Sequence, residues 1–280
     1  PITAPSLYTR KKPNKIALSD YRIKSPYEEK PKLANDLEVA SDFEDDKCLT
    51  LFTQKALDWI KDREKTRPFF LYLPFTSPHK PVIPLKKFRG QGAAGAYGEF
   101  MIETDHHVGQ ILQTLDDEKI TNNTLVIFTS DNGPERTWVE RSKKYNHQSN
   151  GVFREGKRSI YEGGHRVPFI LRWPKKIPAN QKINAPICQT DILATITDII
   201  GKKLPDNCGE DSNSFFEELL NPDHEKVRPP IIHHSSSGRF AIREGSWKLI
   251  MEGRKPHEKR ELHNLNDDPG EKKNLIKSYP

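Results

Sequence analysis

Residues 124–133, TLVIFTSDNG, decide the fold class of this chain. The first six are apolar or β-branched, and a short run of this kind is typical of a strand buried on both faces of a parallel sheet. Asp131 and Asn132 follow directly, at the carboxyl end of the strand, where open α/β sheets bind their ligands. A carboxylate beside an amide offers two oxygens to a divalent cation. The stretch predicts an α/β fold with a candidate metal site.

The same residues also fit a simpler explanation. Asp131, Asn132 and Gly133 belong to the commonest residue types in turns, and taken alone a turn is the more frequent outcome. Two oxygens are also fewer than the roughly 6–8 that calcium takes. The metal site therefore depends on further signals in the sequence.

Strands and helices are predicted to alternate along the chain. Residues 69–73, FFLYL, lie between Pro68 and Pro74 and predict a second strand buried on both faces, and residues 167–171, VPFIL, predict a third strand whose proline indicates an irregular or edge position. Apolar residues at three-to-four spacing predict helices over residues 49–62, 97–115 and 191–200. Asp45 and Asp46 stand where they favour the start of the first helix. This order predicts a mostly parallel sheet flanked by helices.

The two ends of the chain differ from its middle. Residues 1–45 mix lysine, proline and acidic residues, which predicts an extended segment over a surface. Apolar residues alternate with polar ones on both sides of Gly245, which predicts a hairpin. We expect an α/β domain over residues 1–205 and a small antiparallel subdomain over residues 206–280.

Composition excludes several classes of protein. The 280 residues include 45 Lys and Arg against 39 Asp and Glu, and the net charge of +6 suits an anionic substrate but falls far below that of a nucleic-acid-binding tail. No apolar run approaches the roughly 18 residues of a membrane helix. We expect neither a nucleic acid nor a membrane as partner. The chain opens with Pro1 and without the pattern of a signal peptide, so we expect a processed or partial chain.

Two further stretches carry chemically useful residues. His79 lies in residues 77–81, SPHKP, directly after the predicted strand 69–73, and can donate a hydrogen bond or a proton, although a lone histidine is more often structural. Residues 156–168, GKRSIYEGGHRVP, offer Lys157 and Arg166 to an oxyanion. The alternative for the second stretch is a surface loop in which Arg166 pairs with Glu162 or another acid.

In their order, these pieces resemble the sulfatase family, whose members use a formylglycine nucleophile in an alkaline-phosphatase-like α/β fold. The resemblance covers about residues 48–275. Its motifs lie at residues 68–73, 79–81, 105–112, 123–133, 149–151, 156–157, 161–168, 245–250 and 265–271. Each motif is weak alone, and the whole series in this order carries the resemblance.

The resemblance implies a sulfuric ester hydrolase that acts on a sulfated small molecule or, more often, a sulfated glycan. By position, Asp131 and Asn132 match two calcium ligands of the family. Lys157 matches the lysine that contacts the sulfate and the nucleophile, and His79 the histidine that contacts the sulfate and assists the leaving oxygen. These groups supply the positive charge and proton donor that cleavage of a sulfate ester needs. The family also implies a secreted, periplasmic or lysosomal location.

The chain departs from the family pattern at the nucleophile. The family motif begins with Cys or Ser, has Pro or Ala two residues later and Arg four residues later, and none of Cys48, Cys188 and Cys208 begins such a motif. Ser6 and Ser235 have an arginine at that spacing, but Tyr8 and Ser237 occupy the middle position. The family's pair of metal-binding aspartates after a first buried strand has no counterpart either. The sequence therefore predicts the carboxyl-terminal part of a sulfatase, with an incomplete calcium site, no formylglycine precursor and no activity alone. Residues 1–205 would then be a partial catalytic domain.

Two other functions stay open at this point. One is a related hydrolase of the alkaline phosphatase superfamily that acts on phosphate or phosphonate esters. The other is a non-catalytic module that binds sulfated glycans through Lys80, Lys86, Lys87 and Arg89. A solvated basic face is the commoner explanation for that cluster.

Overall fold

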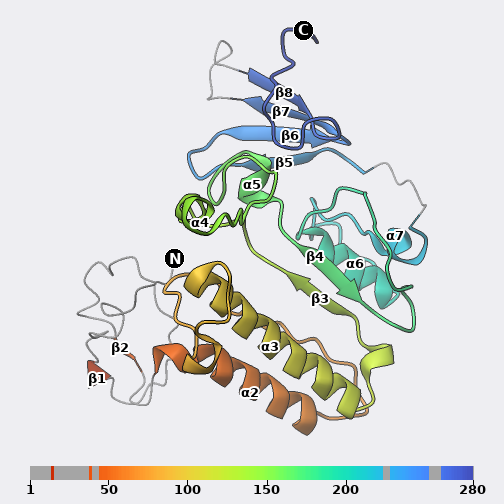
Figure 1. Cartoon of the computed structure of the whole chain (residues 1–280). Helices are drawn as coiled ribbons and strands as arrows, with labels where there is room; N and C mark the ends of the chain where they lie inside the picture. Colours follow the sequence, from red (N-terminus) through yellow and green to blue (C-terminus); the bar gives the residue numbers. More distant parts are fainter. Residues whose placement is uncertain (1–13, 16–37, 40–43, 223–227, 252–259, 280) are drawn as a thin grey trace. The chain divides into compact units, whose positions relative to one another are not determined.

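The computed structural model describes residues 14–15, 38–39, 44–222, 228–251 and 260–279 (Figure 1). Most of the predicted extended segment 1–45 lies outside these residues, apart from a short antiparallel pair of β1 (Asn14–Lys15) and β2 (Glu38–Val39). Internal contacts divide the chain into two compact units. Unit 1 comprises Pro1–Thr121 and Arg141–His147, and unit 2 comprises Asn122–Glu140 and Gln148–Pro280. The predicted domain boundary at residue 205 stays a prediction.

Unit 1 is built on two helices that lie side by side, α2 (Cys48–Asp62) and α3 (Gly95–Asp117) (Figure 1). Both helices were predicted from apolar spacing, and that prediction is confirmed. Asp45–Lys47 form a 3₁₀ turn that runs directly into α2, as expected for the start of this helix. The helices bury apolar residues against each other, among them Leu49, Ile60 and Phe100.

The predicted strand 69–73 is wrong. None of its residues has strand structure, and Phe70 and Tyr72 are 72% and 77% exposed. Phe69 is half-buried and lies edge-on against Trp59, with ring centroids 5.5 Å apart. Apolar composition favours a strand, but a strand also requires a neighbour that completes its backbone hydrogen bonds. Within the described residues, no segment pairs with 69–73.

Unit 2 contains two of the predicted strands, β3 (Val126–Thr129) and β4 (Phe169–Arg172). They pair antiparallel, with Ile127 opposite Leu171, so the expected parallel pairing is not found between these two described strands. The expected burial of residues 124–129 on both faces is also wrong, because all six are half-buried. The helix predicted over residues 191–200 is confirmed as α6 (Asp191–Ile199), and α7 (Phe216–Leu220) follows it.

The predicted C-terminal antiparallel sheet is present in unit 2. Its strand order is β5-β6-β7-β8, formed by Ile231–His234, Phe240–Glu244, Trp247–Met251 and Arg260–Asn264. β6 and β7 form the expected hairpin around Gly245, whose φ of 54° suits glycine. Ala241 and Ile250 of the sheet pack with Ile160 and Tyr161. The sheet thereby buries one face against the loop that leads to α5 (Glu162–His165).

In the sequence, α4 (Trp138–Tyr145), a two-turn helix, lies between β3 and α5. None of the helices in the part of the chain that the structure describes is long and apolar enough to cross a bilayer.

Candidate functional site

The loop after β3 is fixed by its own polar groups. Ser130 Oγ donates a hydrogen bond to the Asn132 carbonyl at 3.2 Å, and Asn132 Nδ2 donates to the Gly133 carbonyl at 2.9 Å. The second bond uses the amide nitrogen of Asn132 and leaves its Oδ1 as the atom for a cation. Asp131 is exposed. The loop therefore presents one carboxylate and one amide oxygen from adjacent residues.

Gly133 joins this loop to α5. Its N–H donates to the Gly164 carbonyl at 2.9 Å, and a Cβ at residue 133 would stand 1.8 Å from the Gly163 carbonyl oxygen. Such a contact is impossible without moving backbone, so glycine is required for the two segments to approach this closely.

Lys157 lies in a second loop held against the first. Its N–H donates to the Pro134 carbonyl at 2.8 Å, and a Cβ at Gly156 would stand 2.4 Å from the same oxygen. Arg158 forms a two-point ion pair with Glu135, at 2.7 and 2.9 Å. The structure thus brings together the loops of three predicted site residues, since Pro134 follows Asp131 and Asn132 closely in the chain.

The fourth predicted site residue, His79, lies in unit 1, and its loop is described by itself. The His79 Nδ1 atom lies 2.6 Å from the Lys80 carbonyl oxygen. If Nδ1 donates its proton to that oxygen, Nε2 is the ring nitrogen left for a ligand. Thr104 Oγ1 donates to Ser77 Oγ at 2.7 Å, which ties the loop to α3. His79 is half-buried. A histidine so held presents one ring nitrogen to a ligand.

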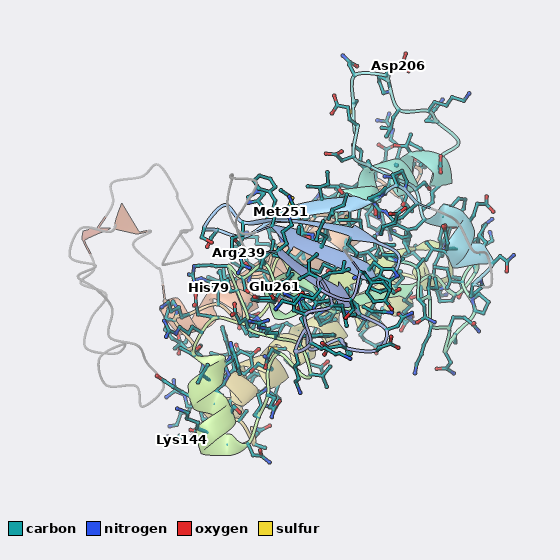
Figure 2. The ribbon with its side chains drawn as sticks, turned by 90° about the horizontal axis from the view of Figure 1, so that it is seen from above. His79, Lys144, Asp206, Arg239, Met251 and Glu261 are labelled. Carbon is teal, nitrogen blue, oxygen red and sulfur yellow. The ribbon has the colours of Figure 1, made fainter. Side chains whose placement is uncertain are left out.

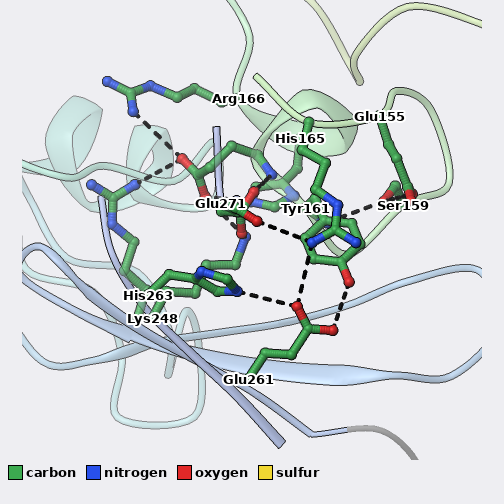
Figure 3. Close-up of polar contacts among 12 residues, drawn as sticks. Glu155, Ser159, Tyr161, His165, Arg166, Lys248, Glu261, His263 and Glu271 are labelled. Atoms are coloured by element: carbon green, nitrogen blue, oxygen red, sulfur yellow. Dashed lines mark hydrogen bonds and ion pairs between the residues drawn. The ribbon is translucent and has the colours of Figure 1, made fainter. Parts of the chain in front are cut away.

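Glu162 is fully buried and is the centre of an ion cluster whose members include His165, Arg166 and Lys248, which are labelled in Figure 3. Its Oε1 lies 3.0 Å from Lys248 Nζ and 3.2 Å from His165 Nε2, and its Oε2 lies 3.4 Å from Arg243 Nη1. Burial alone would raise the pKa of Glu162. The His165 hydrogen bond and the charges of Lys248 and Arg243 outweigh burial and hold that pKa well below its usual range.

The predicted contact between Arg166 and Glu162 is confirmed. Arg166 Nη1 lies 3.5 Å from Glu162 Oε2, and the arginine side chain is 45% exposed. The Arg166 guanidinium also lies over the Phe153 ring, 4.6 Å from its centroid. Both contacts use Arg166 within the protein itself.

A second polar network surrounds Glu261 on β8. Tyr161 Oη donates to Glu261 Oε1 at 2.7 Å, and Arg239, labelled with Glu261 in Figure 2, reaches the same oxygen at 3.3 Å. Burial and the hydrogen bond to Glu261 raise the pKa of Tyr161, which keeps the phenol protonated.

Sequence reasoning did not find either the Glu162 cluster or the Glu261 network. Lys248 lies on the same buried face of β7 as Ile250, two residues away. A lysine at such an inward position needs buried acidic partners, and this was the signal in the sequence that pointed to the networks.

The basic cluster considered as a glycan-binding surface is partly engaged by the protein itself. Lys87 Nζ lies 3.5 Å from His106 Nε2 and 4.7 Å from the centroid of the Phe88 ring. Arg89 Nε donates to the Pro84 carbonyl at 3.0 Å. These contacts within the protein fit the simpler explanation of this cluster as a solvated basic face.

The oxygen donors of Asp131 and Asn132 suit a hard cation such as calcium. Among the residues that the structure describes, no three His, Cys, Asp or Glu side chains gather closely enough to hold a metal. The loop therefore fits part of a calcium site.

The three cysteines are free thiols. Burial raises the pKa of Cys188, which opposes formation of a nucleophilic thiolate there.

Two family models match the chain. The sulfatase model matches residues 13–202, and the model of the C-terminal part of N-sulphoglucosamine sulphohydrolase matches residues 150–279.

Curated relatives are similar over most of the chain. An N-acetylgalactosamine-6-O-sulfatase of Bacteroides thetaiotaomicron is 33% identical over 254 residues, which cover 85% of this chain and 49% of the relative. Human steryl-sulfatase is 35% identical over 191 residues, which cover 68% of this chain and 33% of that protein. The chain thus spans half or less of the length of these two relatives.

Solved structures show the same fold. A Bacteroides thetaiotaomicron protein, described under the metabolism of multiple glycosaminoglycans, superposes with a TM-score of 0.76 at 33% identity, over 85% of this chain and 52% of that one. The protein Ps i-CgsB, solved in complex with k-i-k-neocarrahexaose, gives a TM-score of 0.72 at 25% identity, over 87% and 53%. The expected alkaline-phosphatase-like α/β fold is confirmed by these neighbours.

Proposed function

The chain belongs to the sulfatase family, and we propose that it supplies a sulfate-binding lysine, a proton-donating histidine and two calcium ligands to a sulfuric ester hydrolase. One observation carries this proposal. The hydrogen bonds Gly133–Gly164 and Lys157–Pro134 hold a lysine loop against a loop that bears a carboxylate and an amide.

Each group has a defined task in cleavage of a sulfate ester. Negative charge lies on the nonbridging oxygens of the sulfate, and breaking the S–O bond adds charge to the leaving oxygen. The Lys157 ammonium binds and neutralises nonbridging oxygens. His79 in its imidazolium form keeps its Nδ1–H on the Lys80 carbonyl and donates the proton of Nε2 to the leaving oxygen, which leaves a neutral ring. Asp131 and Asn132 would hold calcium, which supplies further positive charge at the sulfate when bound.

The nucleophile and the remaining calcium ligands are proposed to come from residues outside these 280. None of Cys48, Cys188 and Cys208 stands in the motif of a formylglycine precursor. Electrostatic groups without a nucleophile form no covalent intermediate, so the 280-residue chain alone is expected to be inactive.

We place the substrate among sulfated carbohydrates. Support comes from the relative named N-acetylgalactosamine-6-O-sulfatase, which aligns with 85% of this chain, and from Ps i-CgsB, solved with a neocarrahexaose. We propose a secreted, periplasmic or lysosomal compartment, which the resemblance to the sulfatase family supports. No observation favours the phosphate-ester or glycan-binding alternatives over this proposal.

A reconstitution experiment tests the proposal. The chain is joined to the nucleophile-bearing segment of a related sulfatase and assayed with calcium on an aryl sulfate and on a sulfated sugar. We expect turnover from the joined protein and none above buffer from the chain alone. A joined, folded protein with processed formylglycine and no sulfatase activity would contradict the proposal.

A further inference from the structure

Glu271 ends the Asp268-Pro269-Gly270 turn, a motif to which the proposed function gives no task. The residue is fully buried and has a φ of 50°, in the left-handed region that non-glycine residues rarely adopt. A carboxylate buried in an unfavoured backbone conformation indicates that its side chain is held by specific partners.

Those partners belong to the segment that leads from residue 154 into α5. Glu271 Oε2 accepts the Glu162 N–H at 2.6 Å, and the Glu271 carbonyl accepts from Arg154 Nη1 at 3.0 Å. Glu271 Oε1 also lies 2.8 Å from Lys248 Nζ. Lys248 therefore bridges two buried carboxylates, Glu162 and Glu271 (Figure 3).

The clamped segment is the same one that holds the candidate site. The first residue of α5 is Glu162, whose N–H is fixed by Glu271, and the carbonyl of Gly164 in the same turn accepts the Gly133 N–H. Gly163 N–H donates to the Arg154 carbonyl at 2.9 Å, which closes the segment on itself. The backbone of α5 packs closely on the segment before it, because a Cβ at Gly163 or Gly164 would stand 2.3 Å from a carbonyl oxygen. We therefore expect a shift of α5 to reach the loop of Asp131 and Asn132 through the Gly133–Gly164 hydrogen bond.

We propose that Glu271 and Lys248 are positioning residues for the site. They hold Glu162 at the start of α5, and the Gly164 carbonyl of α5 holds the Asp131–Asn132 loop through the Gly133 N–H. The Pro134 carbonyl of that loop in turn holds the Lys157 N–H. The C-terminal sheet is thereby part of the framework of the site. The role of Lys157 in catalysis rests on the proposed function, but the coupling between Glu271 and these loops does not.

Amide hydrogen exchange resolved by NMR on the 280-residue chain tests this coupling. Glu271→Gln keeps an oxygen that can accept the Glu162 N–H, whereas Glu271→Met removes it. We expect exchange at the Gly133 and Lys157 amides to accelerate by about tenfold or more in Glu271→Met and by less than about threefold in Glu271→Gln. The Ile177 amide, which donates to the Trp173 carbonyl elsewhere in unit 2, is the reference and should not change.

Lys248→Met provides a second, pH-dependent readout. The substitution leaves the buried Glu271 carboxylate without its cation, whereas Glu162 keeps His165, Arg166 and Arg243. Because an unpaired buried carboxylate destabilises the fold when it ionises, exchange at Gly133 and Lys157, corrected for intrinsic rates, should accelerate as pH rises from 5 to 8. The double variant Lys248→Met/Glu271→Gln removes one charge of each sign and should lose most of this pH dependence. If Lys248→Met does not fold, the double variant is measured against the unsubstituted chain instead.

Equal acceleration at Gly133, Lys157 and Ile177 would show a general loss of stability and overturn the proposal. No acceleration in Glu271→Met would overturn it as well. The expected exchange pattern in a chain whose reconstituted form lacks sulfatase activity would support the coupling while refuting the proposed function, so the two failures are distinguishable.

Discussion

Residues 69–73 in unit 1 and residues 247–251 in unit 2 are both five-residue segments rich in apolar side chains, yet only the second is a strand. β7 pairs with β6 on one side and β8 on the other, and both partners lie within 20 residues of it along the chain. Residues 69–73 have no such neighbour among the described residues, and two large aromatic side chains are exposed there. An apolar segment forms a strand where another segment of the described chain completes its backbone hydrogen bonds.

The two units also stabilise buried charge differently. In unit 1, the buried Glu103 of α3 accepts the Leu85 N–H at 2.8 Å, and its other oxygen lies 3.7 Å from His107 Nε2. In unit 2, Lys248 lies within 3.0 Å of both Glu162 and Glu271. Unit 2 therefore depends on ion pairs that hold distant segments together, and we expect its stability to respond to charge changes.

The largest expected contrast comes from truncating one apolar side chain in each segment. Ile250 is fully buried, so Ile250→Ala should lower the free energy of unfolding by about 2–4 kcal/mol. Phe70 is 72% exposed, and Phe70→Ala should change it by less than about 0.5 kcal/mol. Urea denaturation followed by circular dichroism measures both. A Phe70→Ala loss as large as that of Ile250→Ala would show that residues 69–73 are covered.

A smaller effect is expected from pH in unit 2. Burial, His165 and Lys248 lower the pKa of His233 from 6.5 to about 3, and the His165 and His233 ring centroids are 4.1 Å apart. Below pH 6.5 His233 binds a proton in the unfolded chain but stays neutral in the folded chain. The free energy of unfolding therefore falls as pH drops from 6.5 towards 3. Glu162, whose pKa is lowered, keeps its contribution through the upper part of this window.

His233→Asn should remove this loss, about 1–2 kcal/mol at pH 5 relative to pH 7, while Asn keeps a donor near the position of Nδ1. Denaturation curves at pH 5, 6 and 7 measure the slope for both proteins. A wild-type slope that persists unchanged in His233→Asn would assign the pH response to other groups.

The sequence predicted the elements whose pattern is local. Apolar spacing located α2, α3 and α6, and alternation around Gly245 located the β6–β7 hairpin, because helix and hairpin contacts join residues close in the chain. The strand 69–73 failed because pairing is not encoded in the strand itself. Likewise, Glu162, Lys248 and Glu271 lie far apart in the sequence, and only the fold brings them into contact.

For the site, motifs selected Asp131, Asn132 and Lys157, whose loops the structure holds together by backbone hydrogen bonds. The roles of these residues and of His79 stay predictions. The supporting cluster was missed because Glu271 carries no motif that connects it with residue 162. Its contribution depends on a backbone N–H, which sequence patterns do not report.

Turnover of the reconstituted protein with Lys157→Ala tests the central claim most directly. We expect Lys157→Ala to lower kcat by roughly 10²–10⁴, the scale of one group that stabilises charge in the transition state. Arg166→Ala should act through stability and keep turnover within a few-fold, because Arg166 contacts Glu162 and Phe153. Lys176→Ala, at an exposed lysine, controls for loss of positive charge. Near wild-type turnover in Lys157→Ala, with turnover abolished in a stable Arg166→Ala, would contradict the assignment of the sulfate-binding residue.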